Sequence, residues 1–425
     1  MSHADVKQQL LRQIDEDRAL LTRFLSDFVR ARSPNPPGDT REAASCISRF
    51  LDERRVTYKT IAPNPSMPNI VASFDGNAPG KHLVLNGHID VFPLSREEDW
   101  THDPWGGEIV DGRVYGVGCS DMKQGTASMV FAFAYLHAIR DQLRGRLTLT
   151  AVSDEETFGP WGARYLMEHH PEVIGDCCLN AEPGAPTTIR IGEKAPLWIT
   201  FTVETPGAHA AYTHKSESAI KIAARLIADL EAVCDIPVDL PAPVARSLAV
   251  GAAEIDRVHA AGAADIMGKI TLNIGIFDGG TLVNMLPGHC RVEADIRLPF
   301  GMTKEPVLAR IREILERYPQ VKMDVAMDSA RPAWSDPDHE LVQHIRRNAK
   351  AIAGIDALPI TSLAGTDARL WRYAGVPAFS YGTTATNVAM PDEHTDIDEW
   401  IAVIKTQLAS IYDYLTDDVV AETNT

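Results

Sequence analysis

The chain has 425 residues, of which 45% are hydrophobic and 23% charged, a composition typical of a globular protein with a large buried core. A formal net charge of −17 argues against binding to a phosphate backbone, because proteins that do so depend on Lys and Arg. No apolar run reaches the roughly 20 residues that a membrane span requires. Nucleic acid and membrane are therefore not expected partners, and the length favours two domains.

The amino-terminal segment is charged throughout and lacks the apolar core and cleavage site of a secretory signal. The six cysteines form no CxxC pair, and Cys177 and Cys178 are neighbours that do not readily bridge each other. We therefore predict free thiols and a cytoplasmic location.

The first predicted elements are helices. Leu21, Phe24, Leu25 and Phe28 recur at helical spacing, and the run SPNPPG at residues 33–38 ends that helix before a second one begins. Farther along the chain, short apolar runs that end in polar residues alternate with helical segments such as MKQGTASMVFAFAYLHAI; the runs are LVLNGHID, RLTLTAVSDEE, CCLNAEPG and VPAFSYGT. This alternation predicts an α/β domain with a mostly parallel central sheet, whose ligands lie beyond the carboxyl ends of its strands.

Residues 194–330 follow a different pattern. Their order of strand, helix, two strands, helix and strand predicts an inserted α+β domain of the split βαβ, ferredoxin-like type. Within it, residues 235–268 are rich in Pro and Ala, and we expect a long irregular connection with a short helix. Residues 1–193 and 331–425 would then form one domain around the insert.

The strand ends carry the candidate metal ligands. His88 and Asp90 end the run LVLNGHID, and their spacing puts both on one side of an extended strand, so that one can ligate a metal while the other steadies it. An ordinary strand-end hydrogen bond is the alternative. Asp121 precedes a long helix, where capping that helix is the alternative role.

Glu155 and Glu156 follow the next run and point in opposite directions on an extended chain, so one can bind metal while the other faces a water. A solvated turn is the alternative interpretation. Glu182 ends a further strand, and His394 stands in a polar loop. These groups are predicted to meet at one edge of the sheet.

Several motifs together resemble a known family. The motifs SPNPPG, NGHIDVFP, WTHDPWGGEIVDGRVYGVGCSDMKQG, SDEETFG, NAEPG, PGAHAAY, residues 284–297, GTDARL and EHTDI occur in the family's order. On these motifs the chain resembles the family of acetylornithine deacetylase, succinyl-diaminopimelate desuccinylase, aminoacylase and carboxypeptidase G over nearly its whole length.

The resemblance implies two zinc ions per subunit, bridged by Asp121. One ion would also be held by His88 and Glu182, and the other by Glu156 and His394. Nitrogen and oxygen ligands of this kind suit zinc but also admit cobalt or manganese.

The resemblance further implies that Glu155 is the general base, that Asp90 supports His88, and that the peptide bond between Asp121 and Met122 is cis. Attack by a metal-bridging water would remove the acyl group from an N-acyl amino acid, with no covalent enzyme intermediate. A carboxypeptidase or dipeptidase acting on a short peptide is the alternative. A noncatalytic binding member of the fold is disfavoured, because every expected ligand and Glu155 are present.

For the insert, the resemblance implies a dimerisation or lid domain through which a homodimer forms. His209 of PGAHAAY would reach across that dimer to stabilise the oxyanion, while Asn284 and Arg297 would bind a substrate carboxylate, with loop contacts from Gly365 and Thr366. A surface histidine and a strand-end salt bridge are the alternatives for His209 and Arg297.

Two features depart from the family pattern. The path from His209 to Asn284 contains a longer insertion than compact members have, which affects the expected dimer face and substrate pocket. Cys119 lies two residues before Asp121, where it is either a packed small hydrophobe or a site of inhibitory thiol chemistry.

Other enzyme motifs fail on spacing. In HELVQH, His339 and His344 are five residues apart, so they do not share a helical face as in HExxH. The segment GVGCSD has Asp121 in place of the third glycine of GxGxxG, and no GxSxG occurs.

Overall fold

The computed structural model describes residues 2–326 and 331–417, and the chain divides into two compact units. Unit 1 comprises the described residues up to Ile191, Ser335–Ile360, and those from Thr366 onward. Unit 2 comprises Gly192–Trp334 and Thr361–Gly365. The second unit is thus formed almost entirely by one continuous segment.

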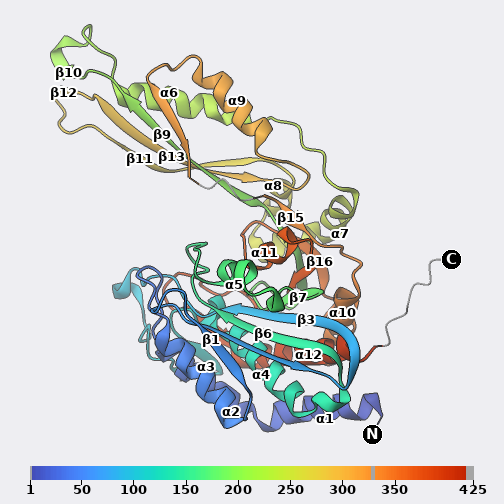
Figure 1. Ribbon diagram of the computed structural model, residues 1–425. Helices are drawn as coiled ribbons and strands as arrows, with labels where there is room; N and C mark the ends of the chain where they lie inside the picture. The colour runs from blue at the N-terminus through green and yellow to red at the C-terminus, as the bar shows by residue number, and fades with distance from the viewer. Residues whose placement is uncertain (1, 327–330, 418–425) are drawn as a thin grey trace. The chain divides into compact units, whose positions relative to one another are not determined.

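The central sheet has nine strands and is mixed (Figure 1). In spatial order its strands are β1 (Tyr58–Ile61), β2 (Asn69–Asp75), β6 (Arg144–Val152), β3 (Ala78–His88), β7 (Cys177–Asn180), β17 (Ala378–Ser380), β8 (Thr188–Glu193) and β15 (Ala333–Trp334), and β16 (Leu358–Ser362) also pairs with β8. Strands β6, β3, β7 and β17 are mutually parallel, whereas the pairings on both sides of them are antiparallel. The parallel part is therefore the middle of the sheet, and the carboxyl ends of its strands face one edge.

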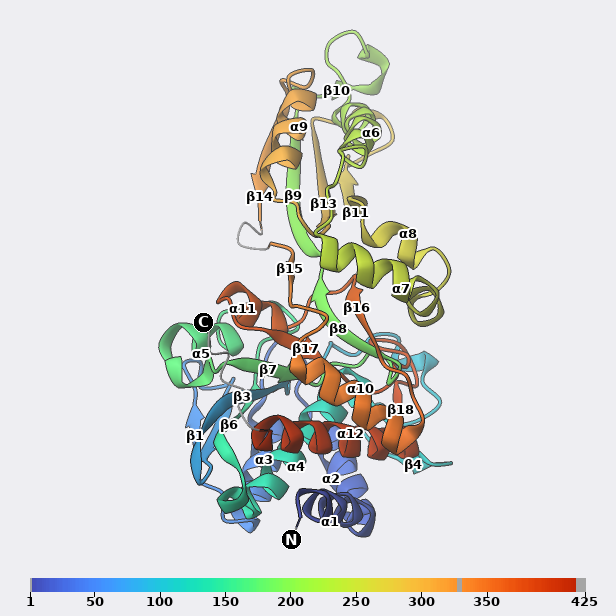
Figure 2. The same ribbon diagram turned by 90° about the vertical axis from the view of Figure 1, so that its right-hand side faces the viewer.

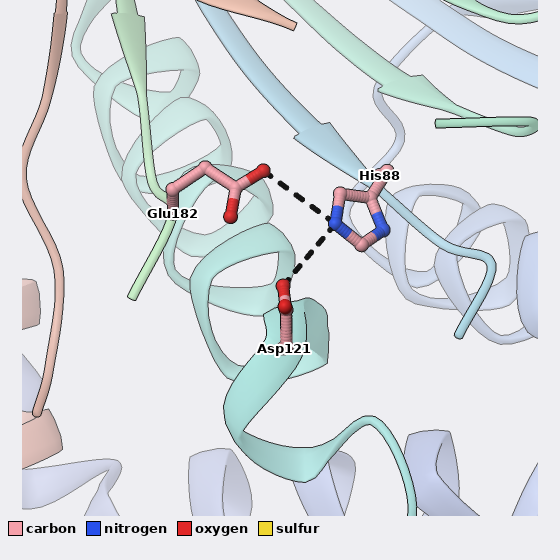
Figure 3. Close-up of side chains that lie close together, drawn as sticks. All are labelled: His88, Asp121 and Glu182. Carbon is pink, nitrogen blue, oxygen red and sulfur yellow. Dashed lines mark ion pairs between the residues drawn. The ribbon is translucent and has the colours of Figure 1, made fainter. Parts of the chain in front are cut away.

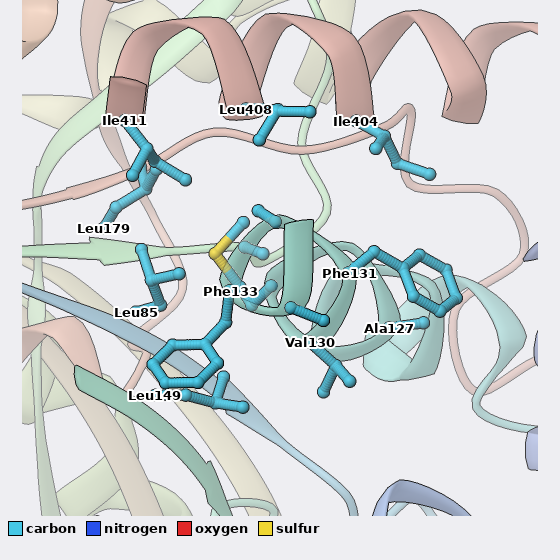
Figure 4. Packing of buried hydrophobic residues seen from close by; sticks show 14 of the residues in the cluster. Leu85, Ala127, Val130, Phe131, Phe133, Leu149, Leu179, Ile404, Leu408 and Ile411 are labelled. Carbon is cyan, nitrogen blue, oxygen red and sulfur yellow. The ribbon is translucent and has the colours of Figure 1, made fainter. Parts of the chain in front are cut away.

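Helices cover both faces of this sheet. Side chains alternate in direction along β3, so Leu83 and Leu85 lie in one hydrophobic cluster and Val84 lies in another on the opposite face. Figure 4 shows Leu85 in the first cluster with residues of α4 and α12. The helices of unit 1 are α1 (His3–Glu16), α2 (Arg18–Arg30), α3 (Arg41–Glu53), α4 (Gln124–Ala138), α5 (Ala163–His169), α10 (Glu340–Ala353), α11 (Ala368–Tyr373) and α12 (Ile397–Thr416).

Helix α4 is buried on nearly every side, which explains why its sequence is apolar all round rather than amphipathic. Lys123, just before it, is fully buried and donates hydrogen bonds to the carbonyls of Phe28 (2.9 Å) and Ala31 (2.6 Å), so it ties the start of α4 to the end of α2. No helix in the described part of the chain is both long and apolar enough to cross a membrane.

Unit 2 contains a four-stranded antiparallel sheet in the order β11 (Thr271–Gly279), β13 (His289–Leu298), β9 (Ala195–Glu204) and β14 (Val321–Val325) (Figure 2). Its helices α6 (Ala219–Leu230) and α9 (Glu305–Leu315) contribute buried residues to the same cluster as the inward-facing residues of the sheet. Along β9, Leu197, Ile199, Phe201 and Val203 are buried and their neighbours are more exposed, the alternation expected of a sheet covered on one face.

The Pro- and Ala-rich stretch of unit 2 differs from the expected irregular connection. It forms α7 (Ala242–His259), which is 18 residues long, and the short α8 (Ala263–Met267). Alanine favours helix, and Pro243 falls in the first turn, where a missing N–H costs nothing.

Short elements complete the fold: β4 (Ile109–Val110), β5 (Arg113–Tyr115), β10 (Ala208–His209), β12 (Met285–Leu286), β18 (His394–Asp396), and the single turns η1 (Glu97–Asp99), η3 (Arg140–Gln142), η4 (Pro171–Val173), η5 (Ala210–Tyr212) and η6 (Glu231–Val233).

Candidate metal centre

Three predicted ligands converge at the carboxyl edge of the parallel strands (Figure 3). His88 ends β3, Glu182 follows β7, and Asp121 lies in the wide turn η2 (Cys119–Lys123) that leads into α4. The Nε2 atom of His88 is 3.4 Å from Oδ1 of Asp121 and 3.5 Å from Oε1 of Glu182. One ligand atom from each residue lies within 4.8 Å of the other two, so a single cation can contact all three.

The backbone fixes the orientation of His88. Its Nδ1 lies 2.9 Å from the carbonyl oxygen of Asp90 and 3.6 Å from that residue's Oδ1, so the hydrogen-bonding partner is the carbonyl rather than the carboxylate. This contact leaves Nε2 facing the two carboxylates. Burial alone would lower the pKa of His88, but Asp121 and Glu182 outweigh it and hold the pKa well above its usual value.

Buried carboxylate oxygens at this edge fit a cation. Among the described residues, Oδ1 of Asp121 and Oε1 of Glu156 are buried without a hydrogen-bond partner. Burial, and next the charge of Asp121, raise the pKa of both Glu156 and Glu182 well above the usual range. Such orphaned, mutually repelling groups are costly unless positive charge compensates them, and the nitrogen and oxygen donors suit zinc.

Asp90 organises the loop that carries the two adjacent glutamates. Its Oδ1 accepts the N–H of Glu155 (3.2 Å), and its Oδ2 accepts the N–H of Glu156 (3.1 Å) and Nδ2 of Asn35 (2.9 Å). The expected role was support of His88 by the side chain. In the structure the Asp90 carboxylate supports this loop, and its carbonyl supports His88.

Asp154 holds the same loop from the other side. It has a φ of 65°, and its carboxylate accepts hydrogen bonds from Asn35 (3.0 Å), Thr157 (2.7 Å) and the N–H of Trp161 (3.0 Å). A Cβ at Gly159 would lie 1.9 Å from Oδ2 of Asp154, so glycine is required where the loop folds over this carboxylate. The alternative of a solvated turn therefore does not describe Asp154 and Glu155, whose side chains are buried.

Glu155 is 7% exposed. Burial raises its pKa to about 8, a shift that His88 opposes and the charge of Asp367 reinforces. A buried carboxyl group with a raised pKa is typical of a group that exchanges protons during catalysis.

His394 begins β18, which pairs with β5, and its Nδ1 lies 2.9 Å from the carbonyl of Asp392. The preceding residue, Glu393, is buried and accepts the N–H groups of Gly118 (3.1 Å), Ser120 (2.9 Å) and Asp121 (3.0 Å). His394 is therefore joined through its neighbour to the turn that carries Asp121. Neither His394 nor Glu156 belongs to the group of ligand atoms that lie within 4.8 Å of one another.

The turn at Asp121 has two further features. The peptide bond between Asp121 and Met122 is cis, as the resemblance implied. Cys119 is buried, its Sγ donates to the carbonyl of Val114 (3.1 Å), and burial raises its thiol pKa to about 12. This favours packing over thiol chemistry at Cys119.

The predicted substrate residues of unit 2 lie at two ends of its sheet. His209 is paired with Met285, and the N–H of Ala210 donates to the carbonyl of Asn284 (2.9 Å), so His209 and Asn284 are close neighbours. Arg297 stands near the far end of β13, where it forms an ion pair with Asp295 (2.8 Å).

His289 and Arg297 are eight positions apart on β13, which at about 3.3 Å per residue is roughly 26 Å. Asn284 lies beyond the His289 end of this strand. A single chain therefore cannot apply both Asn284 and Arg297 to one carboxylate, so the expected pairing would require residues of two subunits. Gly365 and Thr366 lie in the loop between β16 and α11.

Three residues of this region received no role from the sequence: Asn35, Glu393 and Arg369. Each stands inside a motif that was recognised, namely SPNPPG, EHTDI and GTDARL in turn. These motifs were the sequence signal from which a role for the three residues could have been inferred. The contacts that give these residues their roles join segments far apart in the chain: Asn35 donates to Asp90, Glu393 accepts the N–H of Asp121, and Arg369 forms an ion pair with Glu155.

The comparisons with known proteins agree with this geometry. Residues 84–413 match the model of peptidase family M20/M25/M40. A succinyl-diaminopimelate desuccinylase of Cereibacter sphaeroides (strain ATCC 17029 / ATH 2.4.9) is 27% identical over 383 residues, which cover 88% of this chain and 93% of that protein.

Solved structures share the fold at lower identity. The M20 family metallo-carboxypeptidase Sso-CP2 from Sulfolobus solfataricus has a TM-score of 0.78 at 18% identity, covering 92% of this chain and 98% of its own. The Bacillus subtilis YXEP protein, described as a dinuclear metal-binding peptidase from the M20 family, has a TM-score of 0.66 at 15% identity and covers 94% of this chain and 99% of its own.

Proposed function

Because the chain belongs to peptidase family M20/M25/M40, a family of metal-dependent amide hydrolases, we propose that it removes the acyl group from an N-acyl amino acid. Membership confirms the resemblance seen in the motifs. The observation that carries the proposal is the convergence of His88, Asp121 and Glu182 beside a buried Glu155, in a chain whose curated relatives include desuccinylases.

We assign the metal ligands as follows. Asp121 would contribute to both of two metal sites, His88 and Glu182 would complete one of them, and Glu156 and His394 would complete the other. The orphaned oxygens of Asp121 and Glu156 support this assignment, as does the link from Glu393 to the amide of Asp121. Zinc is the proposed metal, and cobalt or manganese fit the same donors.

Bound metal ions of this type polarise a carbonyl and lower the pKa of water. Glu155 then accepts the proton of the attacking water on its carboxylate and delivers it to the leaving nitrogen. Asp90 keeps the Glu155 backbone in place through the hydrogen bond from its N–H, and the burial of Glu155 keeps bulk water from exchanging that proton.

We assign catalysis to the domain made of residues 1–193 and 331–425, and dimerisation to the insert of residues 194–330. In the proposed homodimer, His209 of one subunit stabilises the oxyanion in the active site of the other. Since Asn284 lies beside His209, we propose that these two residues act together.

One chain cannot bring both Arg297 and Asn284 to the same substrate carboxylate. In the proposed dimer, one subunit therefore supplies Arg297 to that carboxylate and the other subunit supplies Asn284. Gly365 and Thr366 add loop contacts to that carboxylate. The six cysteines form no disulfide within the chain, which supports the proposed cytoplasmic location.

A carboxypeptidase or dipeptidase activity is the second candidate, favoured by the likeness in fold to a metallo-carboxypeptidase. The test is a panel of N-succinyl amino acids, N-acetyl amino acids and dipeptides, with zinc or cobalt supplied and metal content verified. We expect the highest kcat/KM on an N-acyl amino acid. A preference for dipeptides would favour the second candidate, and no hydrolysis by the fully metal-loaded protein would contradict both.

A further inference from the structure

Arg369 lies next to the proposed general base. It is the second residue of α11, and its Nη1 is 3.5 Å from Oε1 of Glu155. Both side chains are buried, with 8% of Arg369 and 7% of Glu155 exposed. Buried arginine must be paired, and its charge does not titrate in proteins.

Two further contacts hold the guanidinium in place. Nη1 donates a hydrogen bond to the carbonyl of Thr366 (2.6 Å), and Cζ lies 4.2 Å from the centre of the Phe158 ring. The N–H of Phe158 donates to the carbonyl of Glu155 (2.7 Å), so the stacked ring and the carboxylate belong to one turn. Arg369 thereby joins the turn of Glu155 to the loop of Thr366.

We infer that Arg369 is a positioning residue that fixes the Glu155 carboxylate relative to the loop that binds substrate at Thr366. This inference rests on the proposed function. Oε1 of Glu155 has no hydrogen-bond partner among the described residues, so the ion pair with Arg369 is what restrains this oxygen. A base displaced by about 1 Å loses much of its rate advantage, so a contact that holds the base in position should increase kcat.

Lysine cannot replace arginine fully here. A planar guanidinium can stack on Phe158 and donate to Thr366 while facing Glu155, whereas an ammonium group is a compact point charge that cannot stack in the same way. Arg369→Lys therefore keeps the charge and loses the stacked geometry.

The same helix supplies a matched control. Arg372 is also buried, with 9% exposed, and it donates from Nε (3.0 Å) and Nη2 (2.8 Å) to the carbonyl of Ala378. Loss of Arg372 should cost stability comparable to the loss of Arg369, without involving Glu155.

The experiment compares metal-loaded wild type, Arg369→Gln, Arg369→Lys, Arg372→Gln, Glu155→Gln and the double variant Arg369→Gln/Glu155→Gln. We expect Arg369→Gln to lower kcat by about 10- to 100-fold, with full metal content and a smaller change in KM. Arg369→Lys should recover part of kcat, and Arg372→Gln should lower Tm but not kcat. In the Glu155→Gln background, adding Arg369→Gln should produce no further loss of turnover.

Equal losses of kcat in Arg369→Gln and Arg372→Gln would overturn the inference, because the effect would then be structural. Independent, multiplicative losses in the double variant would also overturn it. If Arg369→Gln does not fold, Arg369→Lys provides the test. A wild-type kcat in Arg369→Lys would contradict the proposed positioning role, whereas a lower kcat at unchanged metal content would support it. Absence of hydrolysis by the wild type itself would instead contradict the proposed function.

Discussion

The carboxylate of Asp90 accepts the backbone N–H of Glu155 at 3.2 Å, although 64 residues stand between them in the chain. The same carboxylate accepts the N–H of Glu156, so one side chain sets the backbone of both the proposed base and a proposed ligand. Replacing it should disturb metal binding and turnover together.

We predict that Asp90→Asn lowers metal affinity and turnover by about 10- to 100-fold, the range typical for groups that orient metal ligands. The amide retains one acceptor oxygen, and its NH2 group faces donors that previously met a carboxylate. Competition with a chelator measures the affinity. Asp176→Asn is the control, because Asp176 accepts a backbone N–H (from His82, 2.7 Å) away from the metal centre. Unchanged affinity in Asp90→Asn would contradict the prediction.

Glu155→Gln should retain both metal ions and lose nearly all turnover. The substitution keeps size and backbone contacts and removes the proton acceptor, which costs on the order of 100- to 10,000-fold in rate. Metal content by elemental analysis and initial rates should be measured on the same samples. Loss of metal in proportion to activity would show instead that Glu155 acts as a ligand.

Metal binding should release protons and become tighter as the pH rises. Burial and the neighbouring Asp121 hold the pKa of Glu156 and of Glu182 well above the usual range, so in the metal-free protein these groups keep their protons to a higher pH than ordinary glutamates do. Metal binds the deprotonated forms, and raising the pH removes the competing protons. Titration calorimetry in two buffers of different ionisation enthalpy measures the protons released. Affinity that stays constant between about pH 6 and 8 would contradict this prediction.

Subunit mixing tests the proposed role of His209. His209→Ala should lower the rate by about 100- to 1,000-fold, as loss of an oxyanion donor does, while metal content stays unchanged. Hybrid dimers of His209→Ala and Glu155→Gln should regain activity, because one of their two sites combines an intact Glu155 with the partner's intact His209. Verified hybrids without recovered activity would refute the cross-subunit role, and a fully active monomer would refute the dimer requirement.

The carboxylate of Asp413 on α12 accepts hydrogen bonds from Lys7 of α1 (2.9 Å) and from Asn348 of α10 (2.9 Å). Burial raises its pKa, but the hydrogen bonds from Asn348 and Lys7 outweigh burial and hold the pKa below the usual 3.8. Its contribution to stability is therefore complete above that value and is lost as the pH falls through the depressed folded-state pKa.

Asp413→Asn should lower the free energy of unfolding by about 2 kcal/mol at neutral pH. The difference from wild type should shrink as the pH falls below 3.8 and through the depressed folded-state pKa, where the wild-type carboxyl group becomes protonated. Denaturant unfolding at several pH values measures both effects. A difference that does not vary with pH would show that packing, not charge, is responsible.

Much of the candidate site followed from local sequence. His88 and Glu182 could be predicted because an apolar run ending in a polar residue predicts a strand end, and the ends of parallel strands meet at one edge of the sheet. The family likewise followed from motif order, since the ligand-bearing segments are short and contiguous.

Which residues of those segments contact one another depended on the tertiary structure alone. The Asp90 carboxylate accepts the N–H of Glu155, and Arg369 forms an ion pair with Glu155, through contacts between segments more than 60 residues apart. In the insert, a ten-residue strand keeps Arg297 away from Asn284, a separation that motif order does not reveal. Periodicity and motifs report which face or end a residue occupies, whereas the partner it meets depends on how distant elements pack.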